Sequence, residues 1–411
     1  MPGDKSVSHR ALIFGALADG VTPVSGLAPG ADVRSTRGVL EALGTKISGS
    51  GRDVVVQGRG LGGLQAPKSD LDAGNSGTTM RLMSGVLAGH PFSSRIIGDE
   101  SLSRRPMERV AAPLRQLGAT IELTARGTAP IAVRGGKLHG AEVRLSVASA
   151  QVKSAALLAG LHASGETTVV EPSATRDHTE KILELFGVSV RRQGLAASVS
   201  GGARLTGTRI DVPGDPSSAA FWCVAAALSL RSELRVSGVM SNPTRTGFMD
   251  VLKRMGADVR RESAPPRAGE GCEDFIIRGA KLRATDIAAS EVPGLVDEVP
   301  ILALAAACAK GRSRFHGLDE LRHKESDRLA GITALLTGFG AQAEVSGDDL
   351  IVTGPTPLRA AVVDSLKDHR LAMTGFVAGF LAAGETSVRD ADCAEISYPT
   401  FYTDFMERIS R

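Results

Sequence analysis

The sequence predicts an α/β fold that is divided into two domains of three repeats each. A turn rich in Gly, Pro, Asp and Ser leads into an Ala- and Leu-rich helix six times, with turns that begin at Pro2, Ala73, Val147, Pro213, Pro293 and Asp364. A helix that ends at a glycine followed by apolar residues recurs about every 70 residues, too long a period for the common solenoids, at Gly44, Gly118, Gly187, Gly256 and Gly340. The length of 411 residues suits two domains.

Between these markers, short β-rich stretches alternate with amphipathic helical stretches. The clearest strands are residues 53–57, 167–171 and 349–353, and the clearest helices are residues 179–186 and 247–255. The glycine after each helix suits the C′ position, where the backbone adopts the left-handed conformation. This alternation with short connections is typical of an α/β fold.

A domain boundary is predicted at Pro213, where the third repeat ends and a new turn begins. The expected domains are therefore residues 1–213 and 214–411. A cleft between two domains commonly binds a ligand, so we expect the site there. Residues 261–272 are rich in Pro, Gly and Glu and are predicted to form a surface loop.

Composition excludes several classes of protein. The 48 basic and 45 acidic residues leave a formal net charge of +3, and aromatic residues make up only 4% of the chain, so we expect no nucleic-acid partner. The longest apolar run, residues 299–309, contains a proline and is too short to span a membrane, and no signal segment precedes it. We therefore expect a cytoplasmic protein without a membrane partner.

The cysteines and histidines do not form a metal or disulfide framework. The four cysteines are widely separated without a CxxC pair, which predicts buried free thiols in a reducing compartment. The eight histidines show no metal-ligand spacing, so we expect no metal site. Neither a GxSxG elbow nor a Cys–His pairing argues for acyl transfer.

The first turn has the features of an anion-binding site. Residues 3–10 form a Gly-rich turn that leads into a helix, which offers backbone N–H groups and the positive end of the helix dipole to a phosphate. Lys5, Ser6 and Arg10 add donors and charge. An ordinary capped helix with solvated cations explains these residues equally well, and the spacing is not that of a Walker A loop. The turn at residues 75–79 resembles a second phosphate cradle, although helix capping explains it more simply.

Cations occur in three later turns, each with an alternative interpretation. Arg104 and Arg105 precede a proline that can start a helix, and two guanidiniums can clamp a carboxylate or phosphate, but a basic surface loop is the usual alternative. Lys324 and Arg328 are expected on one helical face, with a solvent-facing ion-pair ladder as the alternative. The turn before Arg370 is either an anion site or a capped helix start.

Asp297 and Glu298 are the most suggestive acidic pair. They interrupt a strongly apolar stretch, where a solvated carboxylate is not expected. A partly desolvated carboxylate has a raised pKa and can serve in proton transfer. Helix N-capping by Asp297 is the alternative.

Taken together, these segments resemble the 5-enolpyruvylshikimate-3-phosphate synthases. The match covers essentially the whole chain in order, and it rests on residues 2–10, 74–78, 105–107, 149–151, 322–328 and 368–370. The strings Gly-Asp-Lys-Ser-Val-Ser-His-Arg and Lys-Glu-Ser-Asp-Arg are its most specific parts. The Asn-Ser-Gly and Ser-Ala-Gln strings resemble the second bacterial class of this family.

The resemblance implies the inside-out α/β barrel fold of the enolpyruvyl transferases, with two domains of three βαβαββ repeats each. It implies that phosphoenolpyruvate and shikimate 3-phosphate react in the interdomain cleft, through a tetrahedral intermediate, to give the enolpyruvyl ether and phosphate on the route to chorismate and the aromatic amino acids. It also implies that no cofactor is needed. We expect a monomer whose N-terminal domain binds shikimate 3-phosphate and whose C-terminal domain supplies the phosphoenolpyruvate and acid–base groups.

The resemblance also implies roles for individual residues. Those implied to bind shikimate 3-phosphate are Lys5, Ser6, Arg10, Ser149, Gln151 and Arg176. Those implied to bind phosphoenolpyruvate are Gly77, Arg105, Arg328 and Arg370, with Gln151 nearby. Asp297 matches the proton acceptor, and Lys324 with Glu325 matches a catalytic helix, with Asp297 and Lys324 also contacting substrate. Our hypothesis is that Asp297 deprotonates the 5-hydroxyl while Glu325 with Lys5 handles the C3 proton.

Two alternatives stay open. The sister family of UDP-N-acetylglucosamine enolpyruvyl transferases carries a cysteine in the mobile loop before its Arg-Pro, whereas residues 98–106 contain none. A non-enzymatic repeat scaffold of the same α/β unit, as in RNA-binding relatives, is disfavoured by the weak net charge and the few aromatic residues.

The sequence departs from the family pattern in two places. Family members carry a strand-forming stretch before the first turn that crosses back to complete the second domain, whereas this sequence begins at Met1. We therefore expect an unpaired sheet edge and a stability that added upstream residues would raise. A lysine that contacts phosphoenolpyruvate in some members has no counterpart at residues 394–397. Gly77, where glyphosate-resistant relatives have alanine, leaves room for glyphosate.

Overall fold

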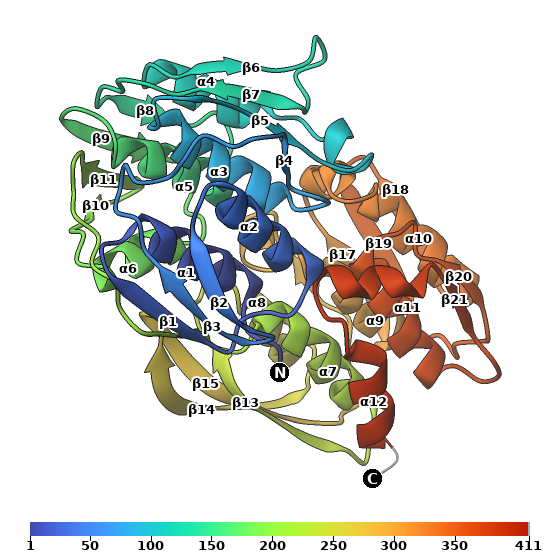
Figure 1. The fold of residues 1–411 in the computed structure, drawn as a ribbon. Helices are drawn as coiled ribbons and strands as arrows, with labels where there is room; N and C mark the ends of the chain where they lie inside the picture. The colour runs from blue at the N-terminus through green and yellow to red at the C-terminus, as the bar shows by residue number, and fades with distance from the viewer. Residues whose placement is uncertain (410–411) are drawn as a thin grey trace. The chain divides into compact units, whose positions relative to one another are not determined.

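A computed structural model describes residues 1–409, which form two compact units (Figure 1). The first, named the N-unit, comprises Gly3–Pro213 and the short segment Arg267–Glu270. The second, named the C-unit, comprises Met1–Pro2, Gly214–Pro266 and the chain from Gly271 onward. Strands and helices alternate along the chain in both units.

The N-unit contains three four-stranded sheets of one plan, in which a parallel pair of strands is followed by two antiparallel strands. The first sheet has the order β12 (Ile210–Asp211), β1 (Val21–Ser25), β3 (Asp53–Gln57), β2 (Lys46–Ser50). The second has the order β4 (Leu71–Asp72), β5 (Ser93–Ile97), β7 (Ile131–Arg134), β6 (Thr120–Glu122). The third has the order β8 (Glu142–Arg144), β9 (Glu166–Val170), β11 (Ala196–Ser200), β10 (Arg191–Gln193). The edge of β1 is paired because β12, from the end of the unit, runs parallel to it.

Three helices form the core of the N-unit: α1 (Lys5–Leu17), α3 (Gly77–Ala88) and α5 (Ala150–Gly160). Almost every residue of these helices is buried, because their sequences are apolar or small on all sides. Three amphipathic helices bury one side only: α2 (Ala31–Ala42), α4 (Glu108–Gln116) and α6 (His178–Leu185). A short 3-10 helix, η1 (Leu102–Arg104), precedes α4. The strands bury alternate residues, so one face of the sheets is exposed.

Within the described residues, the C-unit repeats this plan in one four-stranded sheet, and its other two sheets have three and two strands. The sheets are β13 (Glu233–Met240), β15 (Glu270–Arg278), β14 (Asp258–Arg267); then β16 (Asp286–Ile287), β17 (Gly311–Phe315), β19 (Asp349–Gly354), β18 (Gln342–Ser346); then β20 (Val362–Asp364), β21 (Ser387–Arg389). The helices are α7 (Pro216–Leu228), α8 (Gly247–Arg254), η2 (Val292–Gly294), α9 (Val299–Cys308), η3 (Asp319–His323), α10 (Arg328–Gly338), α11 (His369–Leu381), η4 (Ala391–Ile396) and α12 (Phe401–Ile409). The buried helix α9 packs against α7, α10 and α11.

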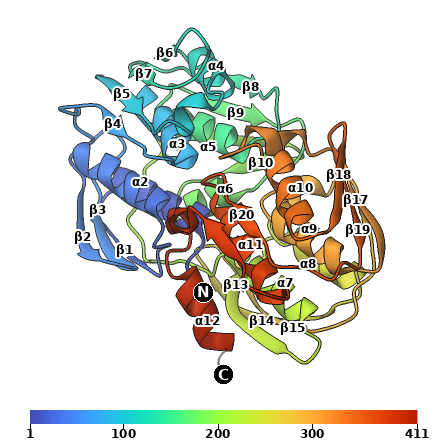
Figure 2. The same cartoon turned by 90° about the vertical axis from the view of Figure 1, so that its right-hand side faces the viewer.

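An aromatic cluster packs the last helix of the C-unit, α12, against α7 and α11. Figure 2 shows α12 as the dark red helix at the C-terminal end of the described chain. The rings of Phe405 on α12 and Trp222 on α7 lie 4.9 Å apart between centroids, and Phe401 lies 5.9 Å from Phe376 on α11. Aromatic pairs at such distances add to the stabilisation that their buried area supplies. The sequence contains a single tryptophan, so the fluorescence of Trp222 reports on this unit.

Most of the predicted elements are confirmed. Each of the six Gly/Pro/Asp/Ser turns leads into a helix, namely α1, α3, α5, α7, α9 and α11. The five glycines after the amphipathic helices all have left-handed φ values, from +86° to +100°. Residues 53–57 and 349–353 are strands, and the predicted helices at residues 179–186 and 247–255 agree with α6 and α8 within one residue at each end.

The prediction of a surface loop at residues 261–272 is wrong. These residues belong to the hairpin of β14 and β15, which turns at Arg267–Glu270. Pro265 and Pro266 lie in β14, which is the outer strand of its sheet. A proline is tolerated in an edge strand because its missing N–H faces away from the ladder.

None of the helices within residues 1–409 has the length and apolarity that a membrane span requires. The apolar run at residues 299–309 is the short buried helix α9. All four cysteines are free thiols.

Two histidines, the buried His90 and the half-buried His162, face each other in the N-unit. The ring centroids of His90 and His162 lie 4.9 Å apart, and neither Nε2 atom has a hydrogen-bond partner within the part of the chain described. Burial lowers the pKa of both imidazoles, and the neighbouring His90 helps to lower the pKa of His162 to about 3. Both rings are therefore neutral near pH 7.

The neutral state of His162 predicts that acid destabilises the N-unit. Because the folded pKa lies below the unfolded value, this stabilisation is present above about pH 6.5 and is lost as the pH falls toward the folded pKa. Between pH 7 and 5, the wild type should lose about 1–2 kcal/mol more unfolding free energy than the His162→Gln variant. Urea unfolding followed by circular dichroism measures the difference. The exposed His139 gives the control His139→Gln, and equal losses in wild type and His162→Gln would contradict the prediction.

Candidate active site

Five of the six helix starts are capped by a side chain. The capping residues, each accepting a hydrogen bond from a backbone N–H in the first turn, are Asp4, Ser76, Ser149, Asp215 and Asp368. At α9 the N-cap residue is Glu298, and its side chain makes no capping bond. The alternative that Asp297 caps this helix is therefore excluded, and its carboxylate is left for other contacts.

The first turn of the N-unit holds two cations that are not solvated side chains. Lys5 Nζ lies 2.8 Å from Asp32 Oδ2, and the Lys5 side chain is 20% exposed. Arg10 is buried, with Nε 2.7 Å from Thr179 Oγ1 and Nη1 2.9 Å from the carbonyl oxygen of Ser6. Burial lowers the pKa of Arg10 to about 10, so the guanidinium stays charged near pH 7. The interpretation as solvated cations is wrong for this turn.

The third turn of the N-unit places Gln151 between two other polar groups. Its amide nitrogen donates to Thr78 Oγ1 at 2.8 Å, and its amide oxygen accepts from Arg81 Nη1 at 2.5 Å. Ser149 caps α5 and is partly exposed. Arg176 is partly exposed in the segment before α6, and its charge lowers the pKa of Arg10.

Two guanidiniums flank Gly77 at the start of α3. A methyl group on this glycine would lie 3.1 Å from Arg81 Nη1 and 3.3 Å from Arg105 Nη1. Arg105 is buried and donates to Asn75 Oδ1 at 2.8 Å. Together, the helix N-terminus and the two guanidiniums can bind an anion. The sequence prediction missed Arg81, although it follows its turn by about one helical turn, as Arg10 follows Lys5.

Arg104 and Arg105 lie in different surroundings, so they do not form a matched pair of guanidiniums. Arg104 is exposed and pairs with Glu100, whereas only Arg105 is buried. The following proline lies outside the helix, because α4 begins at Glu108.

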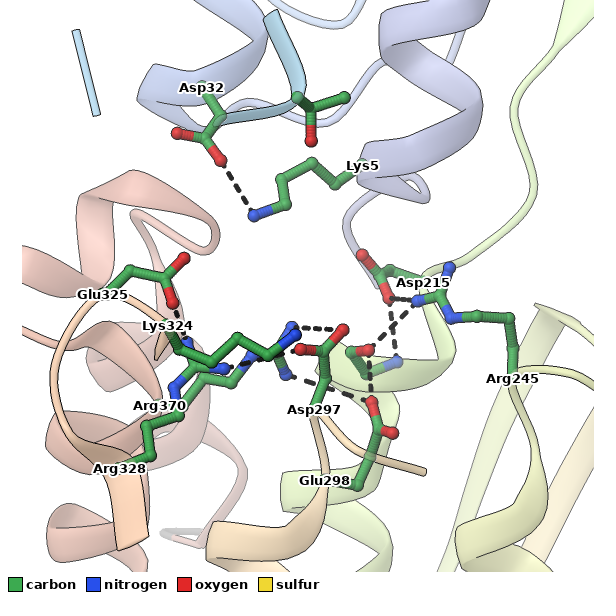
Figure 3. A network of polar contacts seen from close by, with 12 residues as sticks. Lys5, Asp32, Asp215, Arg245, Asp297, Glu298, Lys324, Glu325, Arg328 and Arg370 are labelled. Atoms are coloured by element: carbon green, nitrogen blue, oxygen red, sulfur yellow. Dashed lines mark hydrogen bonds and ion pairs between the residues drawn. The ribbon is translucent and has the colours of Figure 1, made fainter. Parts of the chain in front are cut away.

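The C-unit gathers two guanidiniums around Asp297 (Figure 3). Arg328 is 1% exposed, with Nε 2.8 Å from Asp368 Oδ2 and Nη2 hydrogen-bonded to Glu325. Arg328 Nη1 lies 3.4 Å from Asp297 Oδ1, and Arg370 Nη2 lies 3.8 Å from Asp297 Oδ2. The carboxylates raise the pKa of Arg328 although burial opposes them. The alternative of a solvent-facing ion-pair ladder is therefore excluded.

The prediction that Lys324 and Arg328 share a helical face is wrong. The 3-10 helix η3 ends at His323, Lys324 is extended, and α10 begins only at Arg328. Asp327 fixes that start because its carboxylate accepts from the backbone N–H of Ala330 at 3.1 Å. Lys324 is partly exposed, and burial lowers its pKa although the Asp297 charge opposes this.

The pKa of the Glu298 carboxyl is raised above its ordinary value. Burial is the main cause and the Asp297 charge the next, whereas Arg370, Arg245 and the hydrogen bond from Ser217 act in the opposite direction. The Glu298 side chain is fully buried.

The fourth turn, at Gly214, also takes part in a network of polar contacts that the sequence analysis did not predict. Asp215 Oδ1 accepts from Arg245 Nη2 at 3.1 Å, and Ser217 Oγ accepts from the same nitrogen at 3.0 Å. Ser217 in turn donates to Glu298. No sequence pattern marked Arg245, because it precedes α8 in a separate segment of the chain.

One cluster has the donor atoms of a metal site but is already occupied by an ion-paired lysine. Single ligand atoms of Asp177, His178 and Glu270 lie within 4.8 Å of one another in the N-unit. Lys181 Nζ lies 3.2 Å from Asp177 and 2.9 Å from Glu270. Because the ammonium balances these carboxylates, we assign the cluster to structural ion pairing.

Two solved structures define the class of fold. The chain matches EPSP synthase from Acinetobacter baumannii with a TM-score of 0.88 and 43% identity, over 99% of this chain and 94% of that chain. It matches the enolpyruvyl transferase NikO from Streptomyces tendae with a TM-score of 0.77 and 18% identity, over 98% and 93% of the two chains. The predicted two-domain enolpyruvyl transferase fold is confirmed.

The family follows from sequence comparison. The family model for EPSP synthase (3-phosphoshikimate 1-carboxyvinyltransferase) matches residues 1–405. Relatives named 3-phosphoshikimate 1-carboxyvinyltransferase from Bacillus cereus (strain B4264) and Bacillus anthracis (strain A0248) are each 47% identical over 408 residues, covering 99% of this chain and 95% of the relative. The chain belongs to the EPSP synthase family, as its motifs predicted.

The contacts of Asp368 predict that its carboxylate stabilises the C-unit. Asp368 is fully buried and bonds to Arg328, to Ser326 and to the backbone N–H of Arg370. The Asp368→Asn variant should lose about 3–5 kcal/mol of unfolding free energy, because it leaves the Arg328 charge buried without its main partner. Urea unfolding followed by Trp222 fluorescence measures this loss. The same change at the exposed Asp392 is the control, and a loss in Asp368→Asn no larger than the control's would contradict the prediction.

Proposed function

We propose that this protein transfers the enolpyruvyl group of phosphoenolpyruvate to the 5-hydroxyl of shikimate 3-phosphate and releases phosphate. Membership of the 3-phosphoshikimate 1-carboxyvinyltransferase family supports the reaction. The observation that carries the proposal is the Asp297 carboxylate, which lies between the guanidiniums of Arg328 and Arg370. A carboxylate beside two cations can take a proton from a hydroxyl while the cations bind anionic substrate groups.

The reaction runs by addition and then elimination. In the addition, the 5-hydroxyl loses its proton, its oxygen bonds to C2 of phosphoenolpyruvate, and C3 gains a proton to become a methyl group. In the elimination, the bond from C2 to the phosphate oxygen breaks, C3 loses a proton, and the double bond re-forms as the enol ether. Each half needs one group that accepts a proton and one that donates it, while cations stabilise the phosphate and carboxylate charges.

We assign the proton acceptor to Asp297 and the C3 proton to Glu325 acting with Lys5. Asp297 is 17% exposed, so its carboxylate is accessible to a substrate hydroxyl. Glu325 is hydrogen-bonded to the buried Arg328, which fixes its position. Lys324 contributes a further cation and contacts substrate in this proposal.

The substrate contacts divide into two sets. Shikimate 3-phosphate is bound by cations and hydroxyl or amide groups at the starts of α1 and α5, namely Lys5, Ser6, Arg10, Ser149 and Gln151, and by Arg176 in the segment before α6. Phosphoenolpyruvate is bound by Gly77, Arg105, Arg328 and Arg370, with Gln151 nearby. The buried, hydrogen-bonded state of Arg10, Arg105 and Arg328 supports these roles, because each guanidinium is already fixed in position before substrate binds.

We further infer that the enzyme acts in the cytoplasm on small molecules only and as a monomer without a cofactor. Its four free cysteines support a reducing compartment. The weak net charge supports the absence of a nucleic-acid partner. Light scattering during gel filtration tests the monomer directly.

Phosphate release with different acceptors tests the function. Shikimate 3-phosphate with phosphoenolpyruvate should give phosphate and an equal amount of the enol ether. UDP-N-acetylglucosamine in place of shikimate 3-phosphate should give none. Turnover with the nucleotide sugar alone, or with neither acceptor, would contradict the proposal.

Removal of the Asp297 carboxylate should slow the chemistry. The Asp297→Ala variant is expected to turn over at least roughly 100-fold more slowly than the wild type, the usual contribution of a positioned base. Steady-state kinetics with both substrates measures the loss, and Asp392→Ala serves as the exposed control. A variant that turns over within about tenfold of the wild type would remove Asp297 from the role of base.

A methyl group at position 77 should weaken phosphoenolpyruvate binding. It would lie against the Arg81 and Arg105 guanidiniums, so Gly77→Ala should raise the KM for phosphoenolpyruvate by on the order of tenfold, about 1.4 kcal/mol. The KM for shikimate 3-phosphate should stay nearly unchanged. Gly62→Ala, at a glycine with open space around it, is the matched control. An unchanged KM for phosphoenolpyruvate in Gly77→Ala would contradict this assignment.

A further inference from the structure

Glu298 is a buried carboxyl group without a role in the mechanism described above. Its side chain is fully buried at the start of α9, next to the proposed base Asp297. Oε1 accepts a hydrogen bond from Ser217, and Oε2 has no hydrogen-bond partner within residues 1–409. An ionised carboxylate with one free buried oxygen is far more costly than a neutral acid in the same place.

On the Ser217 side of Glu298, the nearby cation is Arg245, whose charge is already paired with the Asp215 carboxylate. Arg245 Nη2 is 3.1 Å from Asp215 Oδ1 and 3.0 Å from Ser217 Oγ. The hydrogen bonds therefore run in one direction, from Arg245 to Ser217 and from Ser217 to Glu298. Arg245 is paired with Asp215, so it gives Glu298 only part of the compensation that a carboxylate would need.

On its other side, Glu298 faces Arg370, a cation that binds phosphoenolpyruvate in the proposed function. Arg370 Nη1 lies 3.9 Å from Glu298 Oε1, and Arg370 Nη2 lies 3.8 Å from Asp297 Oδ2 (Figure 3). Arg328 is already held by Asp368 and Glu325. If Glu298 were ionised, two carboxylates would face Arg370 and neutralise it. With a neutral Glu298, Arg370 keeps positive charge for an anion.

We propose that Glu298 is a positioning residue that, as a neutral carboxylic acid, packs beside the Arg370 guanidinium without neutralising it. The proposal rests on the proposed function, because the anion that benefits is phosphoenolpyruvate. In this proposal, Asp215 and Ser217 of the fourth turn contribute indirectly to substrate binding, through Arg245 and Glu298.

Several groups bear on the protonation of Glu298, and they lie on every element that packs against it. Burial and the adjacent Asp297 raise the pKa of its carboxyl, whereas Arg370 on α11, Arg245 before α8 and Ser217 on α7 oppose this rise. Lys324 and Arg328 act more remotely, through their contacts with Asp297. As the pH rises, Glu298 loses its proton, gains negative charge beside Arg370 and weakens phosphoenolpyruvate binding.

Infrared spectroscopy tests the neutral state without any turnover. The difference spectrum between the wild-type protein and Glu298→Gln at neutral pD should contain the carbonyl stretch of one protonated carboxylic acid. The same difference for the exposed Glu385→Gln should contain a carboxylate band instead. If the Glu298 spectrum also shows a carboxylate, the proposal is overturned, whatever reaction the protein catalyses.

Kinetics tests the link to Arg370. The KM for phosphoenolpyruvate and kcat are measured from pH 6 to pH 9 for the wild type, Glu298→Gln and Glu385→Gln. At pH 7, Glu298→Gln should retain both parameters within roughly threefold of the wild type, because glutamine is a neutral match for the acid. At alkaline pH, the KM of the wild type and of Glu385→Gln should rise more than the KM of Glu298→Gln. Because the substrate and Lys324 titrate in all three proteins, the comparison between the proteins corrects for these other titrations.

Three outcomes would overturn the proposal. One is turnover by Glu298→Gln that is slower than the wild type by a factor of about 100 or more, which would indicate that the carboxylate itself takes part in the reaction. Another is a parallel rise of KM with pH in all three proteins. The third is failure of Glu298→Gln to fold, because a neutral isostere should replace a neutral acid. An inactive wild type that still shows the protonated-acid band would instead refute the proposed function and leave the state of Glu298 established.

Discussion

The candidate site of the C-unit depends on the burial of the Arg328 guanidinium among carboxylates. A guanidinium that is 1% exposed needs charged partners, because desolvation of an unpaired ion costs several kcal/mol. Asp368 is the main partner, and it also caps α11 by accepting from the backbone N–H of Arg370. One carboxylate therefore fixes both the Arg328 side chain at the start of α10 and the start of the helix that carries Arg370. Asp297, next to the start of α9, completes the group.

The repeats share a fold but not a chemistry. Each turn begins a buried helix, and the cap leaves the side chains around it available for different tasks. In the N-unit, Lys5 and Arg10 follow one turn, while Gly77 and Arg81 follow another. In the C-unit, the turn before α9 presents two carboxyls instead of a cation, and the turn before α7 organises Arg245. In the proposed function, most of these turns bind anions and the turn before α9 transfers protons.

Much of the fold could be predicted from the sequence because its signals are local. The helix starts follow from capping residues, and the left-handed glycines after the helices follow from the need of a C′ residue for positive φ. The hairpin at residues 258–278 was missed because edge position, which permits its prolines, depends on the other strands of the sheet. The start of α10 was missed because a cap at Asp327 interrupts an otherwise helical charge pattern.

For the candidate site as well, local sequence signals were predictive and contacts between distant residues were not. The residue pattern treated Arg104 and Arg105 as equivalent because it could not tell which of them is buried, whereas the resemblance implied Arg105 alone. Arg81, Asp32, Arg245 and Ser217 were missed because their roles come from contacts between residues far apart in the chain. Likewise, the sequence indicated a desolvated carboxyl in the acidic pair, but only the packing shows that the Glu298 side chain is fully buried and that its pKa is raised.

A double-mutant cycle between Arg328 and Asp368 tests the central claim most directly. The unfolding free energies of the wild type, Arg328→Met, Asp368→Asn and the double variant are measured by urea unfolding, with Trp222 fluorescence as the signal. The account predicts a coupling energy of about 2–3 kcal/mol, with the double variant less damaged than the sum of the single variants. Additivity within about 0.5 kcal/mol would contradict it.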